Sequence, residues 1–265
     1  MPDASWRFSG VAGEYDAVRP RPPADLLSLI TQWAGLDRPD VVDLGTGTGL
    51  SAVVWAGSAR QVTAVEPSAD MRGLAERRIA EAAAGSATRF TVLAATAEDT
   101  GLPDGCADVV TASQAMHWFD PDRALPEIAR LLRPGGVLAA YDCDWPPWTD
   151  WETAAAWERV AGRVEAEQRR RGIPEAHQGK DHLGRLQRSG LFRHCAEIAV
   201  HERDQGGADR LVGLAFSAIG NAADFLADGA TEDQLGLTEL REVAARRLSE
   251  SVTWWWTYRV RLAVR

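Results

Sequence analysis

The sequence predicts an α/β protein in which a parallel sheet is covered by helices on both faces. Two observations predict it. Between residues 40 and 141, short runs of β-branched and apolar residues alternate with stretches of helical spacing, and this alternation is typical of βαβ units. Gly45, Gly47 and Gly49 directly follow the first of these runs, as expected where a buried strand turns tightly into a helix.

The composition argues against several classes of protein. The 265 residues are 45% hydrophobic and 25% charged, which is ordinary for a globular protein that buries a full core. The formal net charge of −9 disfavours a nucleic-acid partner, because phosphate binding needs a basic face. No apolar run approaches the roughly 20 residues of a membrane span.

The first ten residues lack the apolar core of a signal peptide, and the three cysteines form no C-x-x-C motif. We therefore expect a cytoplasmic protein with reduced thiols.

A polar N-terminal arm is expected over residues 1–23. The prolines at positions 20, 22 and 23 break any helix at the end of this arm, and Pro22 or Pro23 can open the next helix. Apolar residues then recur at helical spacing from Ala24 to Ala34, and Gly35 can end that helix.

The alternating region gives five strands and three helices. We expect the strands at 40–44, 61–66, 88–94, 107–113 and 137–141, and the helices at 50–58, 68–84 and 121–132. Ligands of parallel sheets lie beyond the carboxyl ends of the strands. The residues that this rule brings to one rim are 45–49, Glu66, 96–99, 113–118 and 142–145.

The pattern changes after Trp145. Helices are expected at 151–170 and 181–189, a strand at 195–201, and helical stretches at 208–227 and 231–249. Residues 254–264 alternate at period two and predict a half-exposed strand, with Tyr258 and Val260 on one face and Arg259 and Arg261 on the other. No linker is visible, so residues 1–265 are expected to form a single domain.

Asp43 indicates the charge of the ligand. A carboxylate at the strand tip repels a pyrophosphate and attracts an ammonium group. The glycine spacing G-x-G-x-G also differs from the G-x-G-x-x-G of nicotinamide enzymes, which disfavours an oxidoreductase. S-adenosylmethionine fits, because it carries an amino-acid end, a sulfonium and no phosphate.

Several motifs together resemble the class I S-adenosylmethionine-dependent methyltransferases. They are 43–49 (DLGTGTG), 65–71 (VEPSADM), 95–99 (ATAED), 114–120 (QAMHWFD) and 131–138 (LLRPGGVL). The set is similar to the small-molecule branch, methyltransferase type 11, which includes ubiquinone/menaquinone-type and trans-aconitate-type enzymes. This resemblance implies a Rossmann-like, doubly wound, seven-stranded sheet that is mostly parallel with an antiparallel last strand. It also implies helical cap insertions at 145–194 and 203–252 over the active site.

The resemblance and the residue chemistry together give the expected cofactor site. Asp43 is expected to receive the methionine ammonium, or else to cap the glycine loop. Glu66 follows at the distance of an acid that binds ribose hydroxyls, and Pro67 and Met71 are expected to wall the adenine. Many relatives have Asp where this chain has Thr96, so Glu98 or Asp99 is expected to replace that contact. The remaining residues expected at the cofactor are Tyr15, Arg19, Gly45, Thr46, Gly47, Gly49, Ala97, Ser113 and Gln114. Tyr15 and Arg19 lie in the arm, where an arginine either pairs with the cofactor carboxylate or stays solvated.

His117 and Asp142 are the candidate catalytic residues. An imidazole titrates near neutral pH and suits a general base, although a structural histidine fits the same position. Asp142 is a candidate base, amine-orienting group or turn cap. The residues expected to bind the substrate are His117, Trp118, Trp145 and Trp148. No metal is expected, because neither the acids nor the histidines have ligand spacing.

The predicted function is methyl transfer from S-adenosylmethionine to a small organic acceptor at oxygen, nitrogen or carbon. The tryptophan-rich cap favours a specialised metabolite over a small carboxylate of the trans-aconitate kind. A cofactor-binding protein with a cyclase or regulatory role is the alternative from another class. We expect no nucleic-acid or membrane partner, and a monomer or homodimer.

Overall fold

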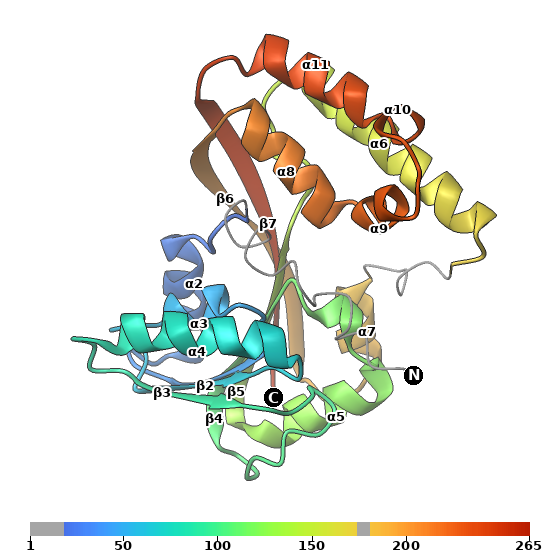
Figure 1. The fold of residues 1–265 in the computed structure, drawn as a ribbon. Helices are drawn as coiled ribbons and strands as arrows, with labels where there is room; N and C mark the ends of the chain where they lie inside the picture. The colour runs from blue at the N-terminus through green and yellow to red at the C-terminus, as the bar shows by residue number, and fades with distance from the viewer. Residues whose placement is uncertain (1–18, 174–180) are drawn as a thin grey trace.

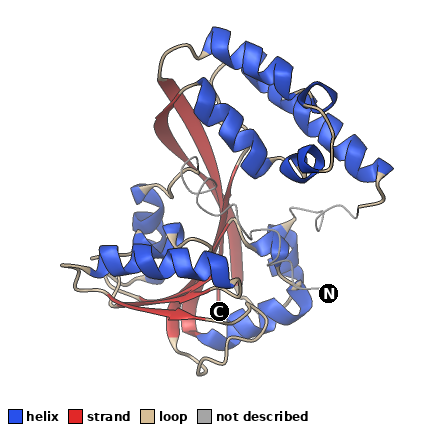
Figure 2. Cartoon of the chain, in the orientation of Figure 1, coloured by secondary structure: helices blue, strands red, loops and turns tan. Residues whose placement is uncertain are grey.

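The computed structural model describes residues 19–173 and 181–265. It has two parts, a sheet flanked by helices and a separate helical layer above it, joined by two long strands (Figure 1 and Figure 2). Tyr15, predicted at the cofactor, lies outside the described residues.

The described residues form one seven-stranded sheet in the order β3-β2-β1-β4-β5-β7-β6. Its strands are β1 (Asp40–Leu44), β2 (Gln61–Val65), β3 (Arg89–Leu93), β4 (Ala107–Ser113), β5 (Leu132–Cys143), β6 (His194–Gly206) and β7 (Val252–Val264). Strands β1 to β5 pair in parallel, and β7 runs antiparallel to both β5 and β6. This confirms the predicted doubly wound, mostly parallel sheet with an antiparallel last strand.

Alternate residues of β1 belong to two different cores. Val41 packs with Leu26 and Ile30 of α2 (Ala24–Ala34) and with Ile79 of α4 (Ala69–Ala83). The neighbouring Val42 belongs instead to the core on the other face, which also includes residues of α5 (Pro121–Leu131) and α7 (His182–Arg188). A strand presents successive side chains to opposite faces, so helices cover the sheet on both sides as predicted.

The upper layer consists of α6 (Trp151–Arg170), α8 (Ala208–Ala218), α9 (Ala222–Ala227), α10 (Glu232–Leu235) and α11 (Leu237–Arg247) (Figure 1). Its core is continuous with the core on the α2 face of the sheet, and buried Trp157 and Trp256 belong to that shared core. The helix α7 does not join this layer, because Leu186 packs into the core on the α5 face. The predicted insertion at 145–194 is therefore divided between the two parts of the molecule.

Strands β6 and β7 pair without interruption from His194 opposite Val264 to Gly206 opposite Val252. They continue past the sheet and lead to the helical layer (Figure 1). The predicted strand at 195–201 ended too early. The strand continues through a charged stretch whose composition alone is typical of a loop.

Glycines account for most of the helix boundaries that were predicted wrongly. The predicted helix 208–227 breaks between α8 and α9 at Gly220, where φ is 45°, and the stretch 231–249 breaks at Gly236, where φ is 80°. A left-handed residue ends an α-helix. The helix expected at 50–58 is the four-residue α3 (Leu50–Val53), followed by turns.

Arg261 does not lie on a half-exposed face as expected. It is only 3% exposed, because Glu197 of β6 and Asp142 of β5 lie on either side and hydrogen-bond to it. A strand with one exposed face was predicted there, whereas β7 is flanked on both sides and these two carboxylates cover Arg261.

Candidate active site

The loops that follow β1, β2, β4 and β5 meet at one rim of the sheet, where the sequence placed them. The Thr46 amide donates to the Val65 carbonyl over 3.1 Å, which joins the β1 and β2 ends. The Gln114 amide donates to the Tyr141 carbonyl over 2.8 Å, which joins the β4 and β5 ends. Ligands of parallel sheets bind at this kind of rim.

Asp43 is fully buried beneath the glycine loop. Its carboxylate accepts hydrogen bonds from the hydroxyls of Thr46 (2.5 Å), Ser51 (2.6 Å) and Thr111 (2.6 Å). Burial raises the pKa of Asp43, and the three hydroxyls oppose that rise. The side chain therefore fixes the loop to β4 and α3, and its direct contact with a methionine ammonium stays a prediction.

Glu66 joins the two loops on which a ribose is expected. Its carboxylate accepts the amides of Gly47 and Ser68, each over 2.9 Å. The side chain is nearly buried, and this burial raises the pKa of Glu66, while the two amide bonds lower it. Each carboxylate oxygen has a further lone pair, so the geometry leaves acceptor capacity for ribose hydroxyls.

The three glycines of the loop all have positive φ, but their surroundings differ. A Cβ on Gly45 would lie 2.8 Å from the Ala115 Cβ, and one on Gly49 would lie 3.1 Å from the Ala75 Cα. A Cβ on Gly47 would meet nothing within 4 Å, at φ 58°. The loop is thus packed against protein at both ends and open at its middle, which fits a ligand lying over Gly47.

Gln114 has φ 52°, and no other non-glycine residue of the described chain has a positive φ. Its side-chain amide donates to the Cys143 sulfur over 2.7 Å. Burial raises the pKa of Cys143 to about 12, so the sulfur stays a thiol at neutral pH. A non-glycine residue keeps such a strained backbone conformation where the surrounding structure holds it in place. Here the strained conformation of Gln114 directs the loop after β4 toward the carboxyl end of β5.

His117 and Asp142, the two candidate catalytic residues, lie together. The His117 Nδ1 is 3.9 Å from the Asp142 Oδ1, and Arg261 donates to the Asp142 Oδ2 over 2.8 Å. A third group, His182, places its Nε2 4.0 Å from the same Oδ2. Burial lowers the pKa of His182, whereas Asp142 raises it. The carboxylate is thus fixed by an arginine and flanked by two imidazoles.

The remaining predicted cofactor residues are spread along the rim. Met71 is buried in α4, and Ala97 is buried in the loop after β3. Glu98 accepts the amide of Asp120 over 2.9 Å, which ties that loop to the start of α5. Pro67, Thr96 and Ser113 lie at the ends of β2, β3 and β4. Their contacts to a cofactor stay predictions.

Arg19 contacts the helical layer. Its guanidinium donates to the Ser217 carbonyl of α8 and lies 4.8 Å from the ring centroid of Trp145. It also lines a cavity of about 480 Å³ beside the start of α3. A pairing with the cofactor carboxylate stays a prediction.

The predicted substrate tryptophans differ in environment. Trp145 is half-buried and packs edge-on against Trp256, with ring centroids 5.3 Å apart. Trp118 is 37% exposed beside His117, and Trp148 is 63% exposed. Trp145 is therefore the one of these three that packs into the core joining the sheet to the helical layer.

Sequence reasoning missed His182, Arg261 and Glu197. Glu197 pairs with Arg261 over 2.6 Å and lies on the wall of a second cavity, of about 380 Å³, beside Asp142. No sequence signal could join these three residues to Asp142, because they come from α7, β7 and β6.

Among the described residues, no three His, Cys, Asp or Glu side chains are grouped to hold a metal ion. No helix of the described chain is long and apolar enough to cross a membrane.

Comparison with known proteins agrees with this geometry. A family model described as a methyltransferase domain matches residues 42–140, which carry the glycine loop, Glu66 and His117. Over these residues the chain is similar to the class I S-adenosylmethionine-dependent methyltransferases. S-adenosylmethionine is the cofactor of this superfamily, and the open loop at Gly47 fits it.

Two bacterial proteins are similar to this chain over part of their length. An uncharacterised methyltransferase of Mycobacterium tuberculosis is 32% identical over 162 residues, which are 61% of this chain and 60% of the relative. A malonyl-[acyl-carrier protein] O-methyltransferase of Pectobacterium atrosepticum is 35% identical over 159 residues, or 58% of each chain. The chain thus spans about 60% of the length of these curated relatives.

A solved structure resembles this chain over nearly its whole length. It comes from Anaeromyxobacter dehalogenans and is described as a type II methyltransferase. It is 27% identical, has a TM-score of 0.68, and covers 93% of this chain and 97% of its own.

Proposed function

We propose that this protein transfers a methyl group from S-adenosylmethionine to a small organic acceptor at oxygen, nitrogen or carbon. One observation carries the proposal: the glycine loop is open over Gly47, and the Glu66 carboxylate binds that same residue from the β2 side. This arrangement suits a nucleoside without phosphates, since a carboxylate accepts from two adjacent hydroxyls.

The cofactor, when bound, supplies an electrophilic methyl group. The chain's own contribution is then to bind and orient the reactants and to exclude water. Glu66 would hold the ribose, Met71 and Pro67 would contact the adenine, and Asp43 would keep the loop in place through its three hydroxyl partners.

His117 would remove a proton from an acceptor that needs deprotonation. A positive charge formed on its ring lies 3.9 Å from Asp142, and an opposite charge at that distance favours the protonated imidazole. Asp142 itself is held by Arg261, so it would orient and stabilise His117 rather than act alone.

The acceptor is proposed to be a specialised metabolite with an apolar or aromatic portion. Half-buried Trp145 at the base of the helical layer supports this. A small carboxylate is the second candidate, supported by the relative named as a malonyl-[acyl-carrier protein] O-methyltransferase. A cytoplasmic location, a monomer or homodimer, and the position of residues 145–194 and 203–252 as a cap over the site stay predictions.

Two measurements test the proposal. Calorimetry should give micromolar binding of S-adenosylhomocysteine and no binding of NADH. Tritium from methyl-labelled S-adenosylmethionine should then appear in a product when candidate acceptors are screened. Cofactor binding without transfer to any acceptor would favour the non-methylating alternative, a cyclase or regulatory protein.

A further inference from the structure

Strand β6 forms one edge of the sheet, and within the described residues it pairs with β7 alone (Figure 1). It is 13 residues long, contains no proline, and pairs with β7 without a change of register. An edge strand of this kind presents a row of unpaired amides and carbonyls to any other strand, unless bulges, prolines, charged side chains or covering segments protect it. The unprotected part of this edge is therefore a candidate interaction surface.

The backbone groups that face outward from β6 belong to its odd-numbered residues. On β7, the Thr257 carbonyl accepts the Asp144 amide over 2.8 Å, and the Arg265 amide donates to the Gly136 carbonyl over 3.0 Å. These odd-numbered residues of β7 thus bond to the β5 side. The backbone groups of successive residues point to opposite sides of a strand, so the even-numbered residues of β7 bond to β6. Even-numbered residues of β7 lie opposite even-numbered residues of β6, which leaves the odd-numbered residues of β6 facing away from the sheet.

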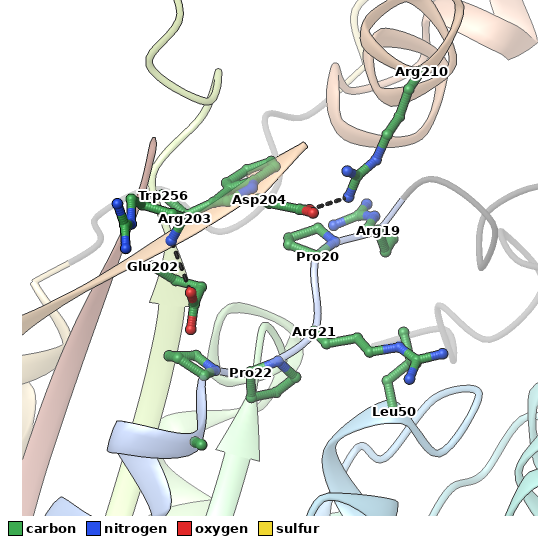
Figure 3. A pocket seen from close by; sticks show the side chains of 12 residues that line it. Arg19, Pro20, Arg21, Pro22, Leu50, Glu202, Arg203, Asp204, Arg210 and Trp256 are labelled. Atoms are coloured by element: carbon green, nitrogen blue, oxygen red, sulfur yellow. Dashed lines mark hydrogen bonds and ion pairs between the residues drawn. The ribbon is translucent and has the colours of Figure 1, made fainter. Parts of the chain in front are cut away.

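The part of this edge nearer the helical layer is closed by side chains. The Arg203 amide donates to the Glu202 carboxylate over 2.8 Å, and the Gln205 amide donates to the Asp204 carboxylate over 2.7 Å. The Gln205 carbonyl accepts from the Arg210 guanidinium over 2.7 Å. Figure 3 shows the bond between Glu202 and Arg203 and the ion pair between Asp204 and Arg210. Another strand could not pair here without displacing these bonds.

The rest of the edge, from residue 195 to residue 201, is open. Its odd-numbered residues are Cys195, Glu197, Ala199 and His201. Within residues 19–173 and 181–265, no acceptor is bonded to their amides. Ile198 lies at the centre of this open segment and is 43% exposed. The segment has a single acidic residue, Glu197, whose carboxylate is paired with Arg261 over 2.6 Å. Its charge therefore does not repel a second strand strongly.

We propose that two copies of this chain pair through their 195–201 segments, antiparallel and about a two-fold axis at Ile198. The four open residues are distributed symmetrically about Ile198. In this register Cys195 of one copy lies opposite His201 of the other, and Glu197 lies opposite Ala199. Each open amide then faces an open carbonyl, as in an antiparallel ladder.

The side chains of the segment are complementary to themselves in the same register. Ile198 lies opposite Ile198 of the second copy, and Ala196 lies opposite Val200, so apolar side chains meet on one face. Beyond the open segment, His194 lies opposite Glu202, and no two like charges lie opposite each other. These pairings arise only between two identical segments, which favours a second copy of the chain over an unrelated strand.

Sedimentation velocity of the full chain tests the pairing. The wild type should show a monomer–dimer equilibrium that depends on its concentration. Ile198→Lys and Ile198→Glu should each weaken dimerisation at least about tenfold, because two like charges then face each other on the axis. An equimolar mixture of these two variants should recover the dimer, because opposite charges then meet. Recovery also shows that both variants fold.

Trp255→Lys is the matched control, because Trp255 is 51% exposed on β7 of the same hairpin but lies outside the open segment. This variant should dimerise as the wild type does. Hydrogen exchange followed by mass spectrometry gives a second measurement. Exchange over residues 195–201 should slow as the protein concentration rises, whereas exchange at Arg203 and Gln205 should stay the same.

The proposal is wrong if the wild type remains a monomer, or if the Ile198 variants dimerise as strongly as the wild type. A mixture of the two variants that stays monomeric would also contradict it, because Ile198 would then not lie on the axis. A dimer that is lost in Trp255→Lys and kept in the Ile198 variants would place the interface on the exposed tryptophans instead.

Discussion

The His117 ring lies 3.9 Å from the Asp142 carboxylate, although His117 belongs to the loop after β4 and Asp142 to the carboxyl end of β5. Arg261, which is 3% exposed, holds Asp142 from the opposite side. The carboxylate cannot move away from Arg261 without breaking that ion pair. In the proposed mechanism, its role is to orient His117 and to stabilise a positive charge on that ring.

Replacing His117 by Gln should slow methyl transfer about 100-fold when the acceptor carries a proton that must leave. The acid limb of the pH–rate profile should disappear, because that limb reports protonation of the base. Asp142→Asn should keep the limb and move it to lower pH, since the carboxylate no longer favours the imidazolium. An identical profile in His117→Gln would leave substrate positioning as the role of this residue.

Asp43→Ala should lower the free energy of unfolding by at least about 2 kcal/mol, because three buried hydroxyls lose their acceptor. Asp43→Asn should cost less, since it keeps the shape and one acceptor oxygen. Urea denaturation measures both. Calorimetry with S-adenosylhomocysteine on Asp43→Asn then isolates the charge: unchanged affinity would show that the cofactor ammonium does not depend on it.

Gly47→Ala and Gly49→Ala form a matched pair. Both place a side chain at positive φ, which costs about 1–2 kcal/mol. Gly49→Ala should destabilise further, because its Cβ would lie 3.1 Å from the Ala75 backbone. Gly47→Ala should instead lose S-adenosylhomocysteine affinity at a smaller cost in stability. Equal affinity in wild type and Gly47→Ala would place the ligand elsewhere.

Glu127 should make stability depend on pH in the acid range. Hydrogen bonds from Arg130 lower the pKa of Glu127 to about 2, from an ordinary value of 4.5. A carboxylate whose pKa is depressed on folding stabilises the protein above the unfolded pKa, and that contribution is lost as pH falls toward the folded one. The difference in Tm between wild type and Glu127→Gln should therefore be largest above pH 5 and shrink toward pH 2. A constant difference would contradict this assignment.

Local sequence signals predicted much of the fold. The strands Asp40–Leu44 and Ala107–Ser113 and the helix Ala24–Ala34 appear with the predicted bounds. Each is set by its own residues, through β-branched runs or through helical periodicity that ends at a glycine. Topology rules then placed the strand ends at a common rim, which is why the glycine loop, Glu66 and His117 could be proposed together.

The partners of Asp142 could not be predicted. Arg261 alternates with apolar residues in a way that suggests an exposed face, and its burial follows from pairing with Glu197 on a neighbouring strand. His182 lies on a short helix whose packing against the sheet no periodicity specifies. Long-range pairing, not local propensity, determines these contacts.

The paired strands β6 and β7 connect the helical layer mechanically to the sheet. Arg261 and Trp256 belong to the same strand, one beside Asp142 within the sheet and the other beneath the helical layer. Any rocking of the helices must twist this ladder, since its hydrogen bonds run unbroken along both strands. A displacement of the helical layer would therefore be transmitted along β7 to Arg261, the residue that holds Asp142.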